Sequence, residues 1–200
     1  MTKQETEYKE LYGDIPQSEI GRLDYLLNTF KSTNNLKGKI TSTITNIRNI
    51  KWKELSYTIY LIPKATPRPR ATRSGVFYVK GAADNKKIFR QFYKDNDFMI
   101  YTPCKFYCTS YLPIPRAMNN LEKILAELGY IRPISKPDFD NLAKTYSDMI
   151  QDSLLYDDQL IIEGSSYKYY SIKPRIEIRI EYMEEYDSQF NLNKSKRMHD

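Results

Sequence analysis

The sequence predicts a small mixed α+β domain preceded by a helical extension. Two runs have their apolar residues at helical spacing, and they lie among segments with the composition of β-strands. Those strand segments are SYTIYLI, CKFYCTSYL, QLIIEGSSYKYY and PRIEIRIEYM. The last of them alternates apolar and charged residues, as an antiparallel strand with one solvated face does. A chain of 200 residues can bury a hydrophobic core, so we expect one domain with an appendage.

Residues 1–55 are expected to form the appendage. Asp14 and Gln17 have the capping types that begin a helix, and an amphipathic helix follows them. Its apolar stripe is Ile20, Leu23, Leu26, Leu27 and Phe30. The polar run KSTNNLKGKITSTITN is interpreted as a linker or a loose second element. The stripe is expected to pack on the main domain or on a partner chain.

The main domain is expected over residues 56–185, with a flexible basic tail over 186–200. The first strand leads into a loop that Pro67 and Pro69 kink. Residues 85–94 favour a short basic helix. The second strand follows, and it ends at the sequence PIP.

Two helices are predicted between the second and third strands. Residues 117–128 carry apolar side chains at helical spacing, and Gly129 is a suitable stop. These apolar residues are Leu121, Ile124, Leu125 and Leu128. The second helix is expected from about residue 141 to 153, and a turn at YDD separates it from the third strand.

Histidine and cysteine are too scarce for several kinds of catalysis. His199 is the sole histidine and stands next to the last residue, which argues against a histidine base or a Ser-His-Asp triad. Cys104 and Cys108 lie four apart on a predicted strand, so they share a face and are interpreted as buried apolar side chains. The sequence has no membrane-spanning run and no secretory signal, so we expect a cytoplasmic protein.

Residues 64–94 concentrate positive charge, with nine Lys or Arg residues and a single acid, Asp84. Phe and Tyr residues are interleaved with them. Because basic groups neutralise phosphates and aromatic faces stack on bases, the segment is a candidate nucleic-acid surface. A solvated basic face with ordinary core aromatics is an equally good interpretation. The candidate contacts are Lys64, Arg68, Arg70, Arg73, Lys80, Lys86, Lys87 and Arg90.

The stretch KPDFDNLAK gathers acidic residues in a chain whose net charge is +6. If a helix begins near Asp140, then Asp140, Lys144 and Asp148 lie along one helix face. Asp138 can point the same way from an extended lead-in. By themselves these residues are readily explained as a helix cap with solvated neighbours.

A second acidic pair, Asp157 and Asp158, follows the same helix in LLYDDQLII. Together, the two pairs and the lysine are a set of hard oxygen ligands that suits Mg²⁺ beside a phosphate. A helix over 141–153 is roughly 20 Å long. Asp158 must therefore fold back along it to join the first pair, or reach the first pair of a partner chain, and the sequence leaves both routes open.

The motifs KPDFDNLAKTYSDMI, LLYDDQLI, YKYY and PRIEIRI occur in this order, and the chain resembles the RusA family of Holliday junction resolvases over roughly residues 57–182. The upstream IPKATPRPRATRSG…FYV is similar to the start of many members. The resemblance implies a small single domain with a mixed sheet and packed helices. It also implies a homodimeric endonuclease, dependent on Mg²⁺ or alternatively Mn²⁺, that cuts four-way DNA junctions symmetrically in recombination and repair. Members are often carried by bacteriophages and prophages.

By motif, the resemblance implies roles for individual residues. Asp138, Asp140 and Asp158 would hold the metal and be catalytic, and Lys144 would be the catalytic lysine. The remaining matches are Lys136 as a DNA contact, and Asp148 and Asp157 as supporting or structural residues.

Two other functions stay open. A catalytically inactive branched-DNA-binding protein would keep the basic segment and the dimer, with the aspartates as caps. A metal-dependent phosphohydrolase of small nucleotides would not need the basic, aromatic segment. The first 55 residues and the run 117–128 have no counterpart in compact family members, which affects the expected substrate preference more than the chemistry.

Overall fold

The computed structural model describes residues 6, 16, 18–31, 34–65, 70–72, 75–77, 98–151 and 153–184. The chain divides into two compact units, Met1–Ile50 and Lys51–Asp200. The second unit combines a four-stranded sheet of mixed direction with helices. The predicted mixed α+β class is therefore confirmed.

The first unit contains the helices α2 (Glu19–Thr29) and α3 (Asn34–Arg48). Ser18 caps α2, because its hydroxyl accepts a hydrogen bond from the amide of Gly21 at 3.1 Å. The expected capping residues, Asp14 and Gln17, lie outside the described residues. No residue of α2 is buried, and the expected packing of its apolar stripe stays a prediction.

Most of the polar run interpreted as a linker or a loose second element lies in the fifteen-residue helix α3, so it is a second element and the linker alternative was wrong. Thr41 and Thr45 each donate a hydroxyl hydrogen bond of 3.0 Å to the carbonyl four residues earlier, which removes their competition with the helix. Ion pairs of 2.6 Å also join α3 to α2. The helical signal was the spacing of Leu36, Ile40, Ile44 and Ile47 among polar residues.

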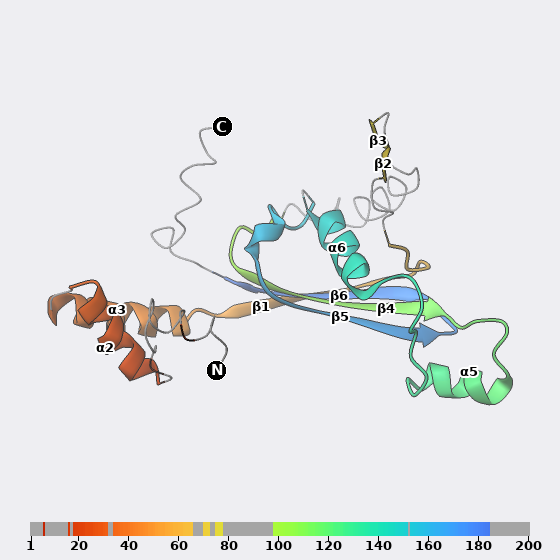
Figure 1. The fold of residues 1–200 in the computed structure, drawn as a ribbon, viewed down its shortest axis with the longest axis horizontal. Coiled ribbons are helices and arrows are strands. Elements are labelled where there is room, and N and C mark those ends of the chain that lie inside the picture. The colour runs from red at the N-terminus through yellow and green to blue at the C-terminus, as the bar shows by residue number, and fades with distance from the viewer. Residues whose placement is uncertain are drawn as a thin grey trace. The chain divides into compact units, whose positions relative to one another are not determined.

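The sheet of the second unit has the strand order β1-β6-β4-β5. Its strands are β1 (Trp52–Ile59), β4 (Cys104–Pro113), β5 (Ile161–Ser171) and β6 (Arg175–Met183). The β1–β6 and β6–β4 pairs are antiparallel, whereas β4 and β5 are parallel. The chain between the parallel strands contains helix α6 (Phe139–Ile150), which covers one face of the sheet (Figure 1).

The core lies between α6 and the covered face of the sheet. Alternate residues of β4 and β6 are buried, as the period of a strand with one packed face requires. Cys104 and Cys108 are both buried and free, so their interpretation as core residues is confirmed. Leu142, Tyr146 and Ile150 from α6 complete the core with no exposed surface.

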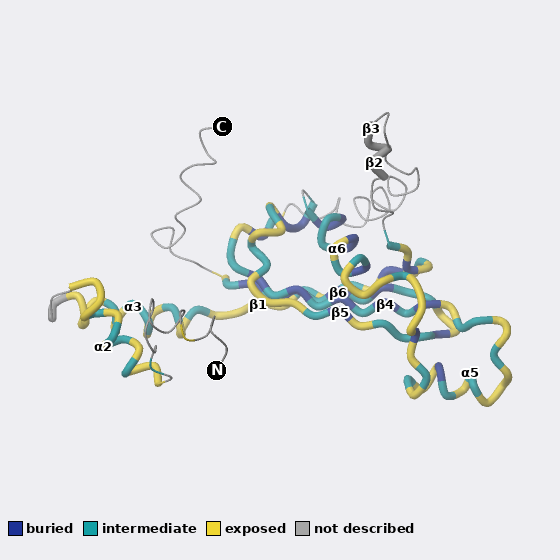
Figure 2. Tube along the Cα trace, in the orientation of Figure 1, coloured by how far each residue is buried: buried dark blue, intermediate teal, exposed yellow. Residues whose placement is uncertain are grey.

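Helix α5 (Asn120–Glu127) forms near its predicted range. It starts at a capping box in which Asn119 and Glu122 exchange backbone hydrogen bonds of 2.9 and 2.7 Å. Gly129 follows the helix with φ at 82°, a conformation that favours glycine. Figure 2 shows that little of α5 is buried, in contrast to α6 and the sheet. Its apolar residues Leu121, Ile124 and Leu128 are exposed.

Two further strands lie in the segment expected to be a loop. β2 (Arg70–Thr72) and β3 (Gly75–Phe77) pair as a short antiparallel ladder. The expected basic helix over 85–94 and the tail over 186–200 lie outside the described residues. Among the helices that the structure describes, none is long and apolar enough to cross a membrane.

Candidate metal and DNA site at the start of helix α6

Helix α6 presents two chemically different faces. Leu142, Thr145, Tyr146, Met149 and Ile150 are buried against the sheet. Asp140 and Lys144, four residues apart, are exposed on the outer surface. The helix begins two residues earlier and ends three residues earlier than expected. The predicted helix therefore exists, and Asp140 and Lys144 lie one turn apart on its exposed face, as expected.

Asp138 is the N-cap residue of α6, with extended backbone angles of φ −70° and ψ 147°. Its side chain makes no capping hydrogen bond. An N-cap aspartate ordinarily accepts a bond from an amide two or three residues on. The carboxylate of Asp138 is thus at the positive end of a helix without serving as its cap, which suits a carboxylate that binds something else.

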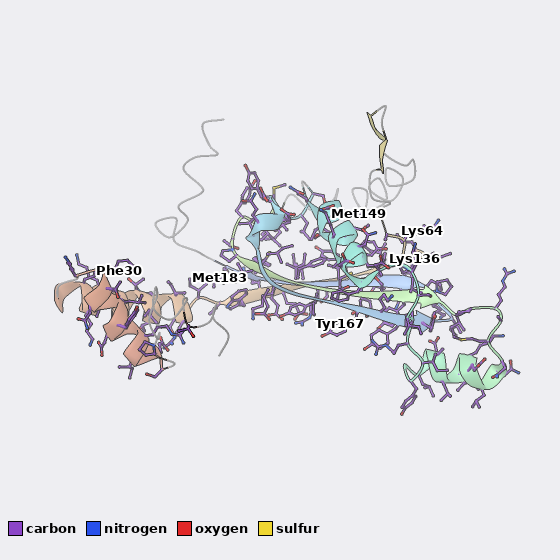
Figure 3. The ribbon with its side chains drawn as sticks, viewed as in Figure 1. Phe30, Lys64, Lys136, Met149, Tyr167 and Met183 are labelled. Atoms are coloured by element: carbon purple, nitrogen blue, oxygen red, sulfur yellow. The ribbon has the colours of Figure 1, made fainter. Side chains whose placement is uncertain are left out.

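The carboxylate of Asp138 lines a cavity of about 600 Å³ beside the start of α6. Lys64 and Lys136 line the same cavity, and Figure 3 shows these two residues next to each other. The other lining residues are Pro63, Ala65, Pro137 and Asn141. The cavity combines an acidic ligand with two cations, and a phosphate bound through a metal ion needs both.

Tyr146 holds the Lys64 segment onto α6. The hydroxyl of Tyr146 accepts a hydrogen bond from the amide of Lys64 at 3.0 Å and donates one to its carbonyl at 3.4 Å. Tyr146 has no exposed surface, and burial raises the pKa of its hydroxyl above the usual value. The hydroxyl therefore stays protonated at neutral pH and fixes one wall of the cavity. Sequence reasoning missed this residue, because its partner lies 82 positions away.

The other wall of the cavity is fastened to strand β5. The ammonium of Lys168 donates hydrogen bonds to the carbonyls of Ser135 and Pro137 at 2.9 and 2.8 Å. Arg132 donates to the carbonyl of Lys168 at 3.0 Å, and its guanidinium lies 3.5 Å from the ring centroid of Tyr169. The segment before Asp138 is therefore bound to β5 at both of its ends.

The second acidic pair lies at the opposite end of α6. Asp157 caps the 3₁₀ turn η1 (Asp158–Leu160) by accepting a 3.0 Å hydrogen bond from the amide of Gln159, so it has a structural role. Asp158 is exposed. The amide of Leu155 donates to the carbonyl of Ile150, which attaches this segment to the carboxyl end of the helix.

The lengths of two elements indicate how far apart Asp138 and Asp158 lie within one chain. The twelve residues of α6 span about 18 Å at roughly 1.5 Å per residue. Along β5, Lys168 contacts the residue before Asp138, and Asp158 precedes Ile161. Those seven strand steps span about 23 Å at roughly 3.3 Å each. Two carboxylates on one metal with ~2 Å bonds lie only a few ångströms apart, so these lengths favour the route through a partner chain, and the place of Asp158 in the site stays a prediction.

No group of three or more His, Cys, Asp or Glu residues able to hold a metal exists within the described part of the chain. The donors at the start of α6 nonetheless fit Mg²⁺, because this ion commonly uses one or two carboxylates together with water and substrate phosphate. Asp138 is the best such donor, because its side chain makes no capping hydrogen bond and the residue lines the cavity. Asp140 follows it in the first turn of the helix.

The predicted DNA contacts are only partly described. Lys64 and Lys136 line the cavity, and Arg70 lies in β2, where only the backbone is described. The remaining predicted contacts, Arg68, Arg73, Lys80, Lys86, Lys87 and Arg90, lie outside the described residues. Asp148 is on α6, half-buried, one turn beyond Lys144.

Comparison with known proteins identifies the class. Residues 61–181, more than half of the chain, match the family model described as Endodeoxyribonuclease RusA. An uncharacterized protein of Bacillus subtilis (strain 168), YqaN, is 30% identical over 135 residues, which cover 63% of this chain and 94% of that protein. The match indicates that the class is a nuclease. The chain belongs to the RusA endodeoxyribonuclease family.

Proposed function

We propose that this protein is a homodimeric, Mg²⁺-dependent endonuclease that resolves four-way DNA junctions by paired, symmetric cuts. The observation that carries the proposal is the cavity at the start of α6. There, Asp138, whose side chain makes no capping hydrogen bond, lines the same cavity as Lys64 and Lys136. Family membership supports branched DNA as the substrate, and the acidic and basic lining supports this cavity as the position where a phosphodiester would react.

Each residue at this position has a separate role in the proposed hydrolysis of a phosphodiester. Asp138 and Asp140 would hold the metal, which when bound would supply a Lewis acid that activates a water for attack on the phosphodiester. Lys144 offsets the negative charge that grows on the scissile phosphate. Lys64 and Lys136 contact the backbone phosphates on either side, and such contacts position the DNA without reading its sequence.

We further propose that each active site is shared between the two chains. Asp138 precedes α6 and Asp158 follows it, and the helix between them is about 18 Å long. A two-fold axis that sets the start of one α6 beside the other chain's η1 would bring in the partner subunit's Asp158. Such an arrangement makes metal binding, and therefore cutting, conditional on dimerisation.

The test compares an end-labelled four-way junction with a matching linear duplex. Wild type, Asp140→Asn and the matched control Asp157→Asn are assayed in Mg²⁺ and in EDTA, with a gel shift in EDTA. We expect paired nicks in the junction alone, abolished by EDTA and by Asp140→Asn, while binding persists. Asp157→Asn should still cut, because asparagine also caps the turn. Tight binding without cutting in any metal would instead establish an inactive branched-DNA-binding protein.

A further inference from the structure

Lys168 is a charged residue on the covered face of the sheet. It pairs in register with Ser110 of β4, which has no exposed surface and shares a strand face with Phe106 and Cys108 of the core. The nearest residues of this face, Ser110 and Ser166, are buried and uncharged, and Phe106 and Cys108 further along it are buried and apolar. Because a half-buried ammonium is costly unless its N–H groups are bonded, a lysine here needs a specific reason.

The partners of Lys168 indicate that reason. Its ammonium bonds the carbonyls of Ser135 and Pro137, which flank Lys136, and Pro137 directly precedes Asp138. These are backbone acceptors, so the bonds fix the path of the chain and not one side chain. Lys168 itself is absent from the residues lining the cavity. It therefore acts on the site only through the segment that carries Lys136 and Asp138.

We propose that Lys168 is a positioning residue that holds the 135–138 segment so that Asp138 presents its carboxylate to the metal. This inference rests on the proposed function for the identity of the site, and it adds a residue on β5 to it. Residues that orient metal ligands typically change metal affinity by about 10- to 100-fold when they are removed. A role confined to fold stability would not change metal affinity at all.

The test uses Lys168→Met, which keeps the length of the side chain and removes its ammonium. Lys168→Arg restores a cation with several donors. Lys173→Met is the matched control, since it removes an exposed lysine five residues further along the chain. Mn²⁺ binding is measured by electron paramagnetic resonance, and hydrogen exchange of peptides over 133–142 is followed without metal. Junction affinity is measured in EDTA.

We expect Lys168→Met to weaken Mn²⁺ binding about tenfold or more and to speed exchange over 133–142. Junction affinity in EDTA should fall much less than Mn²⁺ affinity, because Lys136 is only one of the cations that contact the DNA. Lys168→Arg should regain most of the metal affinity, and Lys173→Met should resemble wild type. Unchanged Mn²⁺ affinity in Lys168→Met would overturn the inference and leave a purely structural lysine. Weaker junction binding with unchanged metal affinity would overturn it in favour of a DNA contact.

The outcomes separate this inference from the proposed function. A wild type that binds Mn²⁺ and cuts no junction would reject the proposed function, and the metal measurements would still decide the role of Lys168. A wild type that binds no Mn²⁺ would overturn both. If Lys168→Met does not fold, Lys168→Gln, which keeps two N–H donors without the charge, is judged by the same measurements.

Discussion

A mixture of two inactive variants provides the sharpest test of a site shared between chains. In the proposed shared site, one chain contributes a first half-site, Asp138 and Asp140 at the start of α6, and the second half-site is the partner subunit's Asp158 at η1. Asp140→Asn removes a carboxylate from the first half-site, and Asp158→Asn removes the carboxylate of the second. Each homodimer should be inactive. In a mixed dimer, one site combines both lesions, whereas the other combines an intact Asp140 with the partner subunit's intact Asp158. The mixture should therefore regain activity that neither variant has alone.

The expected magnitude follows from the geometry and from counting. The two acidic pairs flank α6, whose ends are about 18 Å apart, whereas two carboxylates on one metal lie within a few ångströms of each other. Random exchange of chains makes about half of the dimers mixed, and each mixed dimer has one of its two sites intact. The mixture should then have about a quarter of the wild-type sites. Each intact site nicks a single strand, so the product should be a nicked junction and not two separated duplexes.

The assay co-refolds the variants, isolates mixed dimers through two different affinity tags and follows both labelled strands on a denaturing gel. A mixture of Asp138→Asn with Asp140→Asn is the control. Both of its lesions fall in the half-site at the start of α6, so every site stays broken. Isolated mixed dimers of Asp140→Asn and Asp158→Asn that bind junctions and cut nothing would refute a shared site.

Two further predictions concern the packing that supports the cavity. Tyr146→Phe should lower the free energy of unfolding in urea by about 1 kcal/mol, because the backbone of Lys64 loses its hydroxyl partner. An unchanged midpoint of urea unfolding would mean that a water molecule replaces the Tyr146 hydroxyl. Burial raises the pKa of the Cys104 and Cys108 thiols to about 12 from 9.0. Above pH 9 the unfolded chain loses these protons and the folded chain keeps them, so stability should fall between pH 9 and 12. The slope should be at most about 1.4 kcal/mol per pH unit for each thiol.

The alkaline prediction has its own control. A variant with alanine in place of both cysteines should lose part of the decline in urea unfolding between pH 8 and 10.5, although its cavity lowers stability at every pH. A decline as steep as that of wild type would assign the effect to the tyrosines. Below about pH 8 both states keep nearly all of the thiol protons, so the thiols contribute almost no pH dependence there.

The local parts of the fold and site were predictable from sequence. The alternation of β4 and β6 and the apolar spacing of α6 are properties of neighbouring residues, and they gave the correct element types. Helix α3 was missed because its threonines and asparagines favour turns, and four widely spaced apolar residues outweighed them. The acidic motif could be found because Asp138 and Asp140 are near neighbours in the sequence, at the start of one helix.

The long-range parts could not be predicted. Nothing in the sequence near Lys64 indicates that Tyr146 will hold its backbone, nor does YKYY indicate that Lys168 reaches a loop more than thirty residues earlier. Such contacts depend on which strands become neighbours. The distance between Asp138 and Asp158 likewise depends on the direction of β5 relative to α6, which the sequence left open.

The position of β6 in the sheet affects when the nuclease domain can form. β6 is the last strand of the sheet in the chain, yet it lies between β1 and β4 and bonds to both. During synthesis, β1 has no neighbour to pair with until more than a hundred further residues have emerged from the ribosome. Contacts of such sequence separation form slowly. A nascent chain therefore cannot complete the sheet of its RusA-family domain before β6 is made, so this domain can fold only late in synthesis.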